Sequence, residues 1–190
     1  MTYFCIDTSS LAMSTLSHML QKMQYIFLDF LRAKRMTISN MAMQFSSLLF
    51  LLQVGSTLYM VGLIWFVQLV HYPLHGSVGP EHFALYQQRH MQWTSFAVGP
   101  AMLIEAGTTI VLFAAPSSSF PSWAPTAGLT LLMIVWVSTA LFQVPFHNKL
   151  LSHFDPQAHQ SLVWSNWIRT FGWSARGLLV LWLTSLLLKV

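Results

Sequence analysis

Four stretches of this chain are apolar over about the length that a helix needs to cross a lipid bilayer. A hydrocarbon core about 30 Å thick is spanned by about 20 helical residues. The stretches cover residues 48–70, 95–114, 124–144 and 172–188. The composition agrees, because 55% of the residues are hydrophobic and 7% are charged, whereas a soluble domain carries about a quarter charged residues. The sequence therefore predicts an all-α integral membrane protein, built as a four-helix bundle.

Composition and charge exclude several classes of function. The single cysteine, Cys5, cannot form an intramolecular disulfide or a multi-thiolate metal site. The net charge of +4 is dispersed, with no basic block beyond residues 32–35 and no phosphate-binding glycine loop. Nucleic acid is therefore not an expected partner, and any bound metal requires histidine, carboxylate or amide ligands.

The sequence predicts two regions, an N-terminal extension at residues 1–40 and the four-helix bundle at residues 41–190. Their apolar side chains recur at helical spacing, with the charged ones largely elsewhere, which predicts an amphipathic helix on the membrane surface. The apolar positions are Leu16, Met19, Leu20, Met23, Phe27, Phe30 and Leu31. No continuous apolar core indicates a secretory signal. Two alternatives remain open, namely a poorly ordered extension or a translation start at Met36, Met41 or Met43.

Basic residues predict the orientation of the spans. Basic residues precede the first span and follow the last one. They are Lys22, Arg32, Lys34 and Arg35 before the first span and Lys189 after the last. The connections after the first and third spans hold mainly Arg89 and Lys149. Because basic flanks favour the cytoplasmic side, both termini are predicted to be cytoplasmic, an argument that weakens if translation starts downstream. Most histidines then lie on or near the outer face: His71, His75, His82, His90, His147, His153 and His159.

Two segments that end apolar stretches resemble each other, QLVHYPLH at residues 68–75 and FQVPFHNKL at residues 142–150. An offset of 76 positions pairs His71 with His147 and, without a gap, also pairs residues further along. These further pairs are Pro80 with Pro156, His90 with Asn166, and Thr94 with Thr170. The pattern predicts two duplicated helical hairpins related by a twofold axis along the membrane normal.

The duplication predicts a cofactor site, because paired residues lie at similar depth around that axis. His71 and His147 are expected to face each other near the outer boundary. Gln68 and Gln143, about a turn or less inside, complete the candidate cofactor-binding residues. His71, His90 and His147 are a candidate metal site, because neutral imidazole binds copper, iron, zinc or a haem. The alternatives are that no cofactor is bound and that these histidines are interfacial hydrogen-bonding residues.

Charged residues inside the spans form a second candidate group. Glu105 lies near the middle of the second span, where a bare carboxylate is costly, so it is predicted to be protonated, paired or beside water. Arg176 is expected to reach Glu105 from the fourth span. Asn166 and Arg169 share a helical face with Arg176 that must point inward, because lipid offers their donors no partner. These four are the candidate catalytic residues, and the alternative is a structural ion pair.

The segments VPFHNKL and DPQAHQSLVWSNWIRTFGWSARGLL resemble a set of small four-helix membrane proteins that includes the fungal anthrone oxygenases. The matching positions are Pro145, His147, Asn148, Leu150, Asn166, Trp167, Arg169 and Thr170. The resemblance covers the second hairpin well and the first loosely. It implies a four-helix bundle and, for the characterised branch, oxidation of an activated polycyclic phenol by dioxygen.

Two classes of function follow from these observations. In the first, the chain is an oxidoreductase whose histidines serve as bases or metal ligands, while Arg169 and Asn166 stabilise a phenolate or enolate oxygen of a lipophilic aromatic or quinone-like substrate. In the second, it is a non-catalytic accessory or cofactor-binding subunit. The expected partners are the lipid bilayer, a lipophilic small molecule, and either further copies of the chain or a larger membrane complex.

Overall fold

The computed structural model describes residues 8–188, and every secondary-structure element in that part of the chain is helical. The elements in order are α1 (Thr8–Phe66), η1 (Val67–His71), α2 (Tyr72–His75), α3 (Pro80–Ala114), α4 (Ala124–Ser138), η2 (Thr139–Gln143), α5 (Val144–Lys149) and α6 (Pro156–Leu187). The elements η1 and η2 are single π-helical turns. The predicted all-α class is confirmed.

The chain divides into two units, residues 1–47 and residues 48–190. In the first unit, every side chain that is described, from Gln21 onward, is exposed. Three positions of the predicted amphipathic face, Leu16, Met19 and Leu20, lie outside the residues whose side chains are described. The boundary follows Ser47, a little later than the predicted boundary after residue 40.

Among the described residues, three helical segments are long and apolar enough to cross a membrane. They are Gln21–His75, Pro80–Ala114 and Ala124–Lys149. Helix α6 has 32 residues but falls outside this group; Arg176 lies within its most apolar part, residues 170–187. Asn166, Arg169 and Arg176 of α6 are buried.

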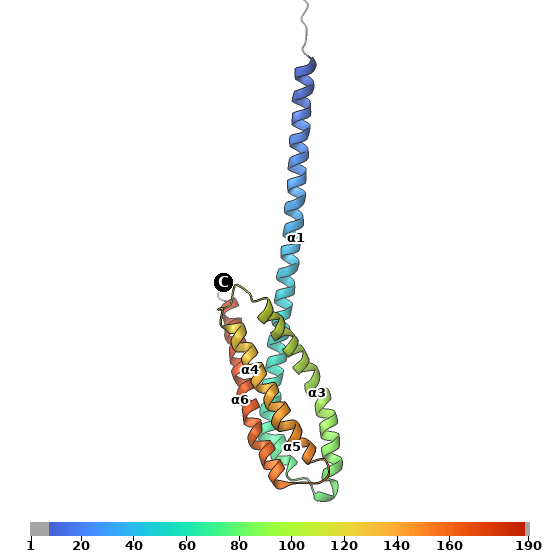
Figure 1. Cartoon of the computed structure of the whole chain (residues 1–190), viewed down its shortest axis with the longest axis vertical. Helices are drawn as coiled ribbons and strands as arrows, with labels where there is room; N and C mark the ends of the chain where they lie inside the picture. The colour runs from blue at the N-terminus through green and yellow to red at the C-terminus, as the bar shows by residue number, and fades with distance from the viewer. Residues whose placement is uncertain (1–7, 189–190) are drawn as a thin grey trace, which may run out of the picture. The chain divides into compact units, whose positions relative to one another are not determined.

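In the second unit, α4 packs along both α6 and α3 (Figure 1). The buried side chains between the helices include Met60, Ile64, Met102, Val135 and Trp173. Helices α4 and α6 approach closely, since a Cβ atom at Gly172 would lie 2.7 Å from Val135 Cγ2. Small residues allow such close contact between apolar helices.

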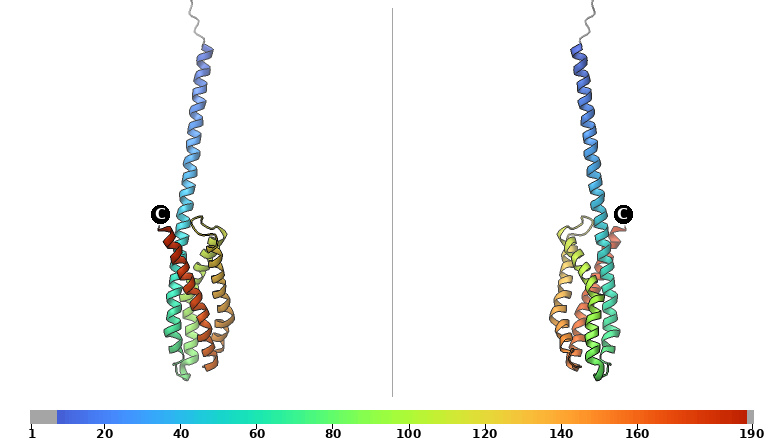
Figure 2. Two further views of the ribbon diagram at one scale, coloured as in Figure 1. Left: turned by 90° about the vertical axis from the view of Figure 1, so that its left-hand side faces the viewer. Right: turned by 90° about the vertical axis from the view of Figure 1, so that its right-hand side faces the viewer.

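The turns at residues 76–79 and 150–155 lie at the same end of this unit, as both views in Figure 2 show. We call this end the turn end. A second set of buried apolar side chains closes it: Tyr72, Phe83, Leu150, Ala158 and Leu162. Helix α6 begins there at a capped terminus, where Asp155 Oδ1 accepts hydrogen bonds from the backbone N–H groups of Gln157 and Ala158 at 2.9 and 3.2 Å. The sequence predicts this Asp-Pro helix start.

The two π-helical turns occur at equivalent places in the two hairpins. Each is followed by a short helix with proline as its second residue, Pro73 in α2 and Pro145 in α5. A proline has no N–H, and its ring clashes with the carbonyl four residues earlier in an α-helix. The wider π turn places the proline without breaking the helix, and such turns are frequent at functional sites.

This equivalence implies a different register for the predicted repeat. It pairs Pro73 with Pro145, and therefore His75 with His147 and His71 with Gln143. The predicted pairing of His71 with His147 is displaced by about one helical turn. The displacement has a simple cause in the connections between helices. The stretch from Pro145 to Pro156 in the second hairpin is four residues longer than the stretch from Pro73 to Pro80 in the first. From Pro80 and Pro156 onward the predicted offset of 76 positions agrees with the structure, because these two prolines begin α3 and α6.

Candidate functional site

The predicted site residues fall into two groups at different levels of α6. Arg176 belongs to a polar cluster with Glu105, which we call the Glu105 network: Gln53, Thr57, Glu105, Thr108, Thr109 and Arg176. Asn166 and Arg169 lie about two turns away along α6, toward the turn end. There they accompany the histidine cluster, formed by His71, His75, His90, His147 and His159. The four candidate catalytic residues therefore do not form one site.

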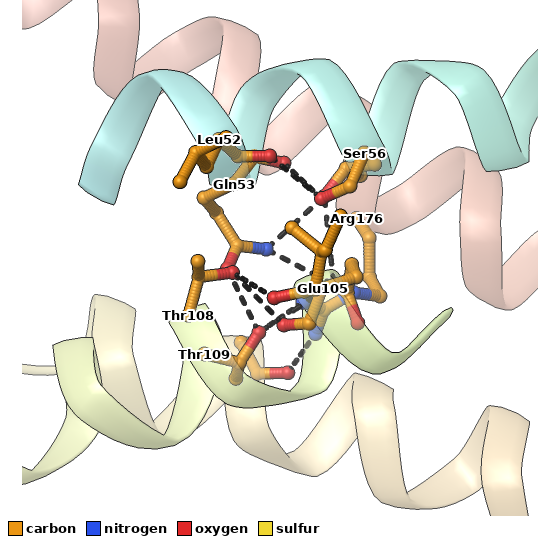
Figure 3. Close-up of polar contacts among 10 residues, drawn as sticks. Leu52, Gln53, Ser56, Glu105, Thr108, Thr109 and Arg176 are labelled. Atoms are coloured by element: carbon orange, nitrogen blue, oxygen red, sulfur yellow. Dashed lines mark hydrogen bonds and ion pairs between the residues drawn. The ribbon is translucent and has the colours of Figure 1, made fainter. Parts of the chain in front are cut away.

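The Glu105 network is centred on an ion pair. Arg176 Nη2 pairs with Glu105 Oε1, as the sequence predicts, and both side chains are buried. Figure 3 shows Gln53 approaching the same carboxylate from α1, with its Nε2 donating to Glu105 Oε1 at 3.0 Å. Thr109 also contributes, because its hydroxyl oxygen accepts from Arg176 Nη2 at 2.7 Å. The ion pair thus has hydrogen-bond partners on several helices.

These contacts connect four helices. Gln53 Oε1 accepts hydrogen bonds from the hydroxyl groups of Thr108 and Thr109 on α3, and Arg176 Nη1 donates to the Gly128 carbonyl on α4. The cavity beside the network measures about 40 Å³, which is enough for about one or two water molecules. The geometry favours a structural role, and a catalytic role for Glu105 and Arg176 stays a prediction.

The histidine cluster brings together rings from η1, α2, α3, α5 and α6 at the turn end. The ring of His90 lies between two of the predicted ligands, with its centroid 4.4 Å from that of His71 and 5.2 Å from that of His147. The ring of His75 joins them, 5.7 Å from His71 and 5.8 Å from His90. The predicted convergence of His71, His90 and His147 is therefore present, with His75 as an additional member.

Gln87 on α3 fixes the orientation of two of these rings. Its Nε2 lies 2.9 Å from the carbonyl oxygen of His147, and a carbonyl only accepts, which identifies the amide nitrogen. The second N–H of this amide donates to His147 Nδ1 at 3.1 Å. At the other end of the side chain, Gln87 Oε1 accepts from His75 Nε2 at 2.9 Å.

The hydrogen bonds to Gln87 assign the ring protons. His75 carries its proton on Nε2, so the lone pair of its neutral ring is on Nδ1. His147 accepts at Nδ1 and carries its proton on Nε2, which lies 3.3 Å from Tyr72 Oη. Both ring nitrogens of His147 therefore have partners. In this arrangement His147 does not offer a free lone pair to a metal.

Gln68 and Gln143, the predicted cofactor-binding amides, hydrogen-bond to α6. Gln68 Oε1 accepts from Asn166 Nδ2 at 2.8 Å, and Gln143 Nε2 donates to Ser165 Oγ at 3.1 Å. Both glutamines are buried. These bonds attach each π-helical turn to α6, and a cofactor-binding role for the two amides stays a prediction.

Arg169 is a buried cation without a carboxylate partner in the described part of the chain. Its side chain is 8% exposed, and the ion pair found among the described residues joins Arg176 to Glu105 instead. Arg169 Nη1 donates to Asn166 Oδ1 at 3.1 Å, while its Nε has no hydrogen-bond partner in the described part of the chain. A buried charge is stabilised only by an opposite charge or by strong hydrogen bonds. Among the residues that the structure describes, the positive charge of Arg169 is therefore not compensated by an ion pair.

A pocket of about 290 Å³ opens between α3 and the segment that contains η2 and α5. Its polar end holds His90, His147 and Arg169, and its walls include Val98 and Met102. A smaller cavity of about 50 Å³ adjoins it, with the same three polar residues in its lining. The uncompensated guanidinium and two imidazoles thus face a space of the size that binds small organic molecules.

No group of three or more His, Cys, Asp or Glu side chains has the geometry of a metal site among the described residues. The rings of His71, His90 and His147 lie together without directing three lone pairs to one point. The metal assignment of these three residues stays a prediction.

Sequence reasoning missed His75 and Gln87 as site residues. His75 has a detectable signal, because it lies four residues after His71 and so on the same helical face. Gln87 has none, since a glutamine in an amphipathic segment normally faces water. Only the packing of α3 against α2 and α5 shows that Gln87 is fully buried.

Comparisons of this chain with protein-family models, with curated proteins and with solved structures find no match. The resemblance to the anthrone oxygenases therefore rests on the motifs of the second hairpin alone, and the geometry of the site is the main basis for inferring a function.

Proposed function

We propose that the chain is a multi-pass membrane four-helix bundle, with both termini on the cytoplasmic side, that binds and oxidises a lipophilic aromatic or quinone-like molecule. The single observation that carries the proposal is the uncompensated charge of Arg169 at the polar end of the pocket. The apolar composition and the three span-length helices support the membrane setting.

The buried guanidinium favours a ligand with an anionic or strongly polarised oxygen. A hydrogen bond between Arg and an oxyanion is about twice as strong as a neutral one, and it strengthens further in a site that excludes water. Asn166 already accepts from Arg169 Nη1, which orients the guanidinium. A phenolate, enolate or quinone oxygen meets these requirements.

The walls of the pocket favour a flat apolar body behind that oxygen. Val98, Gly99 and Met102 of α3 face Val144 across the space, and none of these side chains offers a hydrogen bond. Gly99 leaves room, because a Cβ atom there would meet nothing within 4 Å. A lipophilic ligand concentrated in the bilayer is expected to enter between α3 and the segment that contains η2 and α5.

The proposed reaction converts an activated methylene group to a carbonyl. His90, whose Nδ1 lies 3.1 Å from Thr94 Oγ1, removes a proton from the carbon, since both nitrogens of His147 have partners. Arg169 stabilises the resulting enolate oxygen. Dioxygen then oxidises the carbanion, so that one methylene and one dioxygen yield one carbonyl and one water.

Binding and turnover of anthrone by the purified chain in lipid nanodiscs test the proposal. We expect saturable binding, with one dioxygen consumed and one anthraquinone formed for each anthrone. Arg169→Gln should weaken binding by 100-fold or more, because about 3 kcal/mol for a charge-assisted hydrogen bond corresponds to that factor. The matched control is Arg89→Gln, an exposed arginine on α3. Equal binding by both variants would reject the assignment of the pocket.

The second candidate function is a cofactor-binding or accessory subunit. It is favoured by two buried imidazole nitrogens, His71 Nε2 and His75 Nδ1, which have no hydrogen-bond partner among the described residues. A visible spectrum and metal analysis of the purified protein separate the candidates. A Soret band supports haem binding, whereas anthrone turnover by a colourless, metal-free preparation supports the cofactor-independent enzyme.

A further inference from the structure

We infer that His71 Nε2 and His75 Nδ1 form a two-coordinate site for monovalent copper at the turn end. The two histidines are four residues apart and lie on one face where η1 passes into α2. Paired histidines at this spacing can bind one metal ion together. The site differs from the predicted His71, His90 and His147 set in its ligands and in its coordination number.

The distance between the two rings fits a shared ion. Metal–nitrogen bonds of about 2 Å place the centroids of two imidazoles no more than about 6 Å apart when both bind one ion. The centroids of His71 and His75 are 5.7 Å apart, and their planes differ by 29°. This separation lies within the limit, so both rings can reach one ion.

The two nitrogens are unusual because they are buried without partners. His75 is 0% exposed, and neither its Nδ1 nor His71 Nε2 has a hydrogen-bond partner among the residues that the structure describes. Leaving a buried polar atom unpaired is costly, and most such atoms in native proteins are paired. A metal ion accepts the lone pairs of both nitrogens at once.

Gln87 prepares His75 for this role. Its Oε1 accepts the proton on His75 Nε2, which leaves the lone pair on Nδ1. Metal-binding histidines characteristically donate their other N–H to an oxygen, which fixes the tautomer and the ring orientation. Gln87 is itself held by the His147 carbonyl, so it cannot rotate freely to release His75.

The surroundings favour a monovalent ion. In the described part of the chain, the histidine cluster itself includes no carboxylate, and the buried carboxylate of Glu105 is paired with Arg176. Arg169 adds a positive charge close to His147 and His90. A divalent ion with two neutral ligands would leave two further charges uncompensated at low dielectric. Copper binds imidazole strongly, and its monovalent form accepts two ligands.

His90 closes the site without serving as a ligand. Its ring stacks on His71 with the centroids 4.4 Å apart and the planes 20° apart. No group of three or more metal-binding side chains is found among the described residues, in agreement with a site of two ligands. The copper site does not depend on the ligand proposed for Arg169, so the two proposals can fail separately.

Anaerobic titration of the full chain in lipid nanodiscs with monovalent copper, against a colorimetric copper chelator, tests the inference. We expect one copper per chain and an X-ray absorption edge typical of two-coordinate copper. His71→Ala and His75→Ala should each weaken binding by at least 100-fold. Gln87→Ala should weaken it by about 10- to 100-fold, as loss of an orienting partner does. His82→Ala, which alters an exposed histidine of α3, should leave the affinity unchanged.

Gln87→Glu keeps an oxygen for the His75 N–H and is the control for misfolding. Gln87→Ala is replaced as a test if it fails to fold. The site is then still supported when Gln87→Glu retains copper and folded His71→Ala loses copper. Wild-type copper affinity in both histidine variants would overturn it. Tight binding of divalent zinc without binding of monovalent copper would overturn the copper assignment. Loss of anthrone binding in Arg169→Gln with unchanged copper affinity would show that the two sites are independent.

Discussion

His75 and His147 bind opposite ends of one side chain, the carboxamide of Gln87. His75 Nε2 donates to its oxygen at 2.9 Å, and His147 Nδ1 accepts from its nitrogen at 3.1 Å. The two histidines occupy equivalent places after the π-helical turns of the two hairpins. A single residue therefore joins the two hairpins at the turn end and determines which nitrogen of each ring carries a proton.

Replacing Gln87 by leucine is expected to remove the hydrogen bonds that fix the rings of His75 and His147. The variant leaves the His75 N–H and two acceptor atoms of His147 without partners, at a cost of about 1–3 kcal/mol for each buried group. Nitrogen NMR of selectively labelled histidine should show one fixed tautomer for His75 and His147 in the parent chain and a mixture in the variant. Unchanged tautomers would contradict the assignment.

The ion pair between Glu105 and Arg176 predicts strong energetic coupling. Glu105→Leu or Arg176→Met alone should lower the free energy of unfolding by about 3–5 kcal/mol, because each leaves one buried charge unpaired. The double variant should be destabilised by much less than the sum. Denaturant unfolding in detergent micelles measures the cycle, and strictly additive effects would argue against a close ion pair.

Substitution of Arg169 is expected to change the free energy of unfolding in the opposite direction to substitution of Arg176. Because its charge has no ion-pair partner among the described residues, Arg169→Met should raise the free energy of unfolding by about 1 kcal/mol or more while abolishing ligand binding. The two arginines lie on the same face of one helix, so each serves as a control for the other. Equal destabilisation by both substitutions would show that Arg169 is compensated within the fold.

The close approach of α4 and α6 predicts a strict requirement for glycine at position 172. A Cβ atom there would lie 2.7 Å from Val135 Cγ2, so Gly172→Ala should cost about 1–3 kcal/mol of stability. Gly107→Ala is the matched control, since a Cβ atom at Gly107 meets nothing within 4 Å. That variant is expected to be neutral or stabilised by up to about 1 kcal/mol.

A second substitution separates steric overlap from a general intolerance of α6. Val135→Ala removes the methyl group that a new Cβ would meet, so Gly172→Ala should cost less in that background than in the parent chain. Thermal unfolding of the four proteins measures the difference. An unchanged cost would place the strain elsewhere in the helix.

Several features followed from local sequence alone. The helical segments and the Gly-Pro and Asp-Pro starts of α3 and α6 were predictable, because helix length, apolar content and capping are properties of neighbouring residues. The inward face of Asn166, Arg169 and Arg176 was predictable from helical spacing, and all three are buried. The contact from Arg176 to Glu105 followed from the high cost of leaving either charge alone in an apolar core.

The register of the repeat and the identity of the site were decided by tertiary structure. A constant offset cannot detect that the second connection is longer, so the sequence paired His71 with His147, whereas the helix geometry pairs His75 with His147. The burial of Gln87 and the absence of an ion partner for Arg169 among the described residues depend on which helices become neighbours. Periodicity determines the face on which a side chain lies, but only packing between distant segments determines its partner.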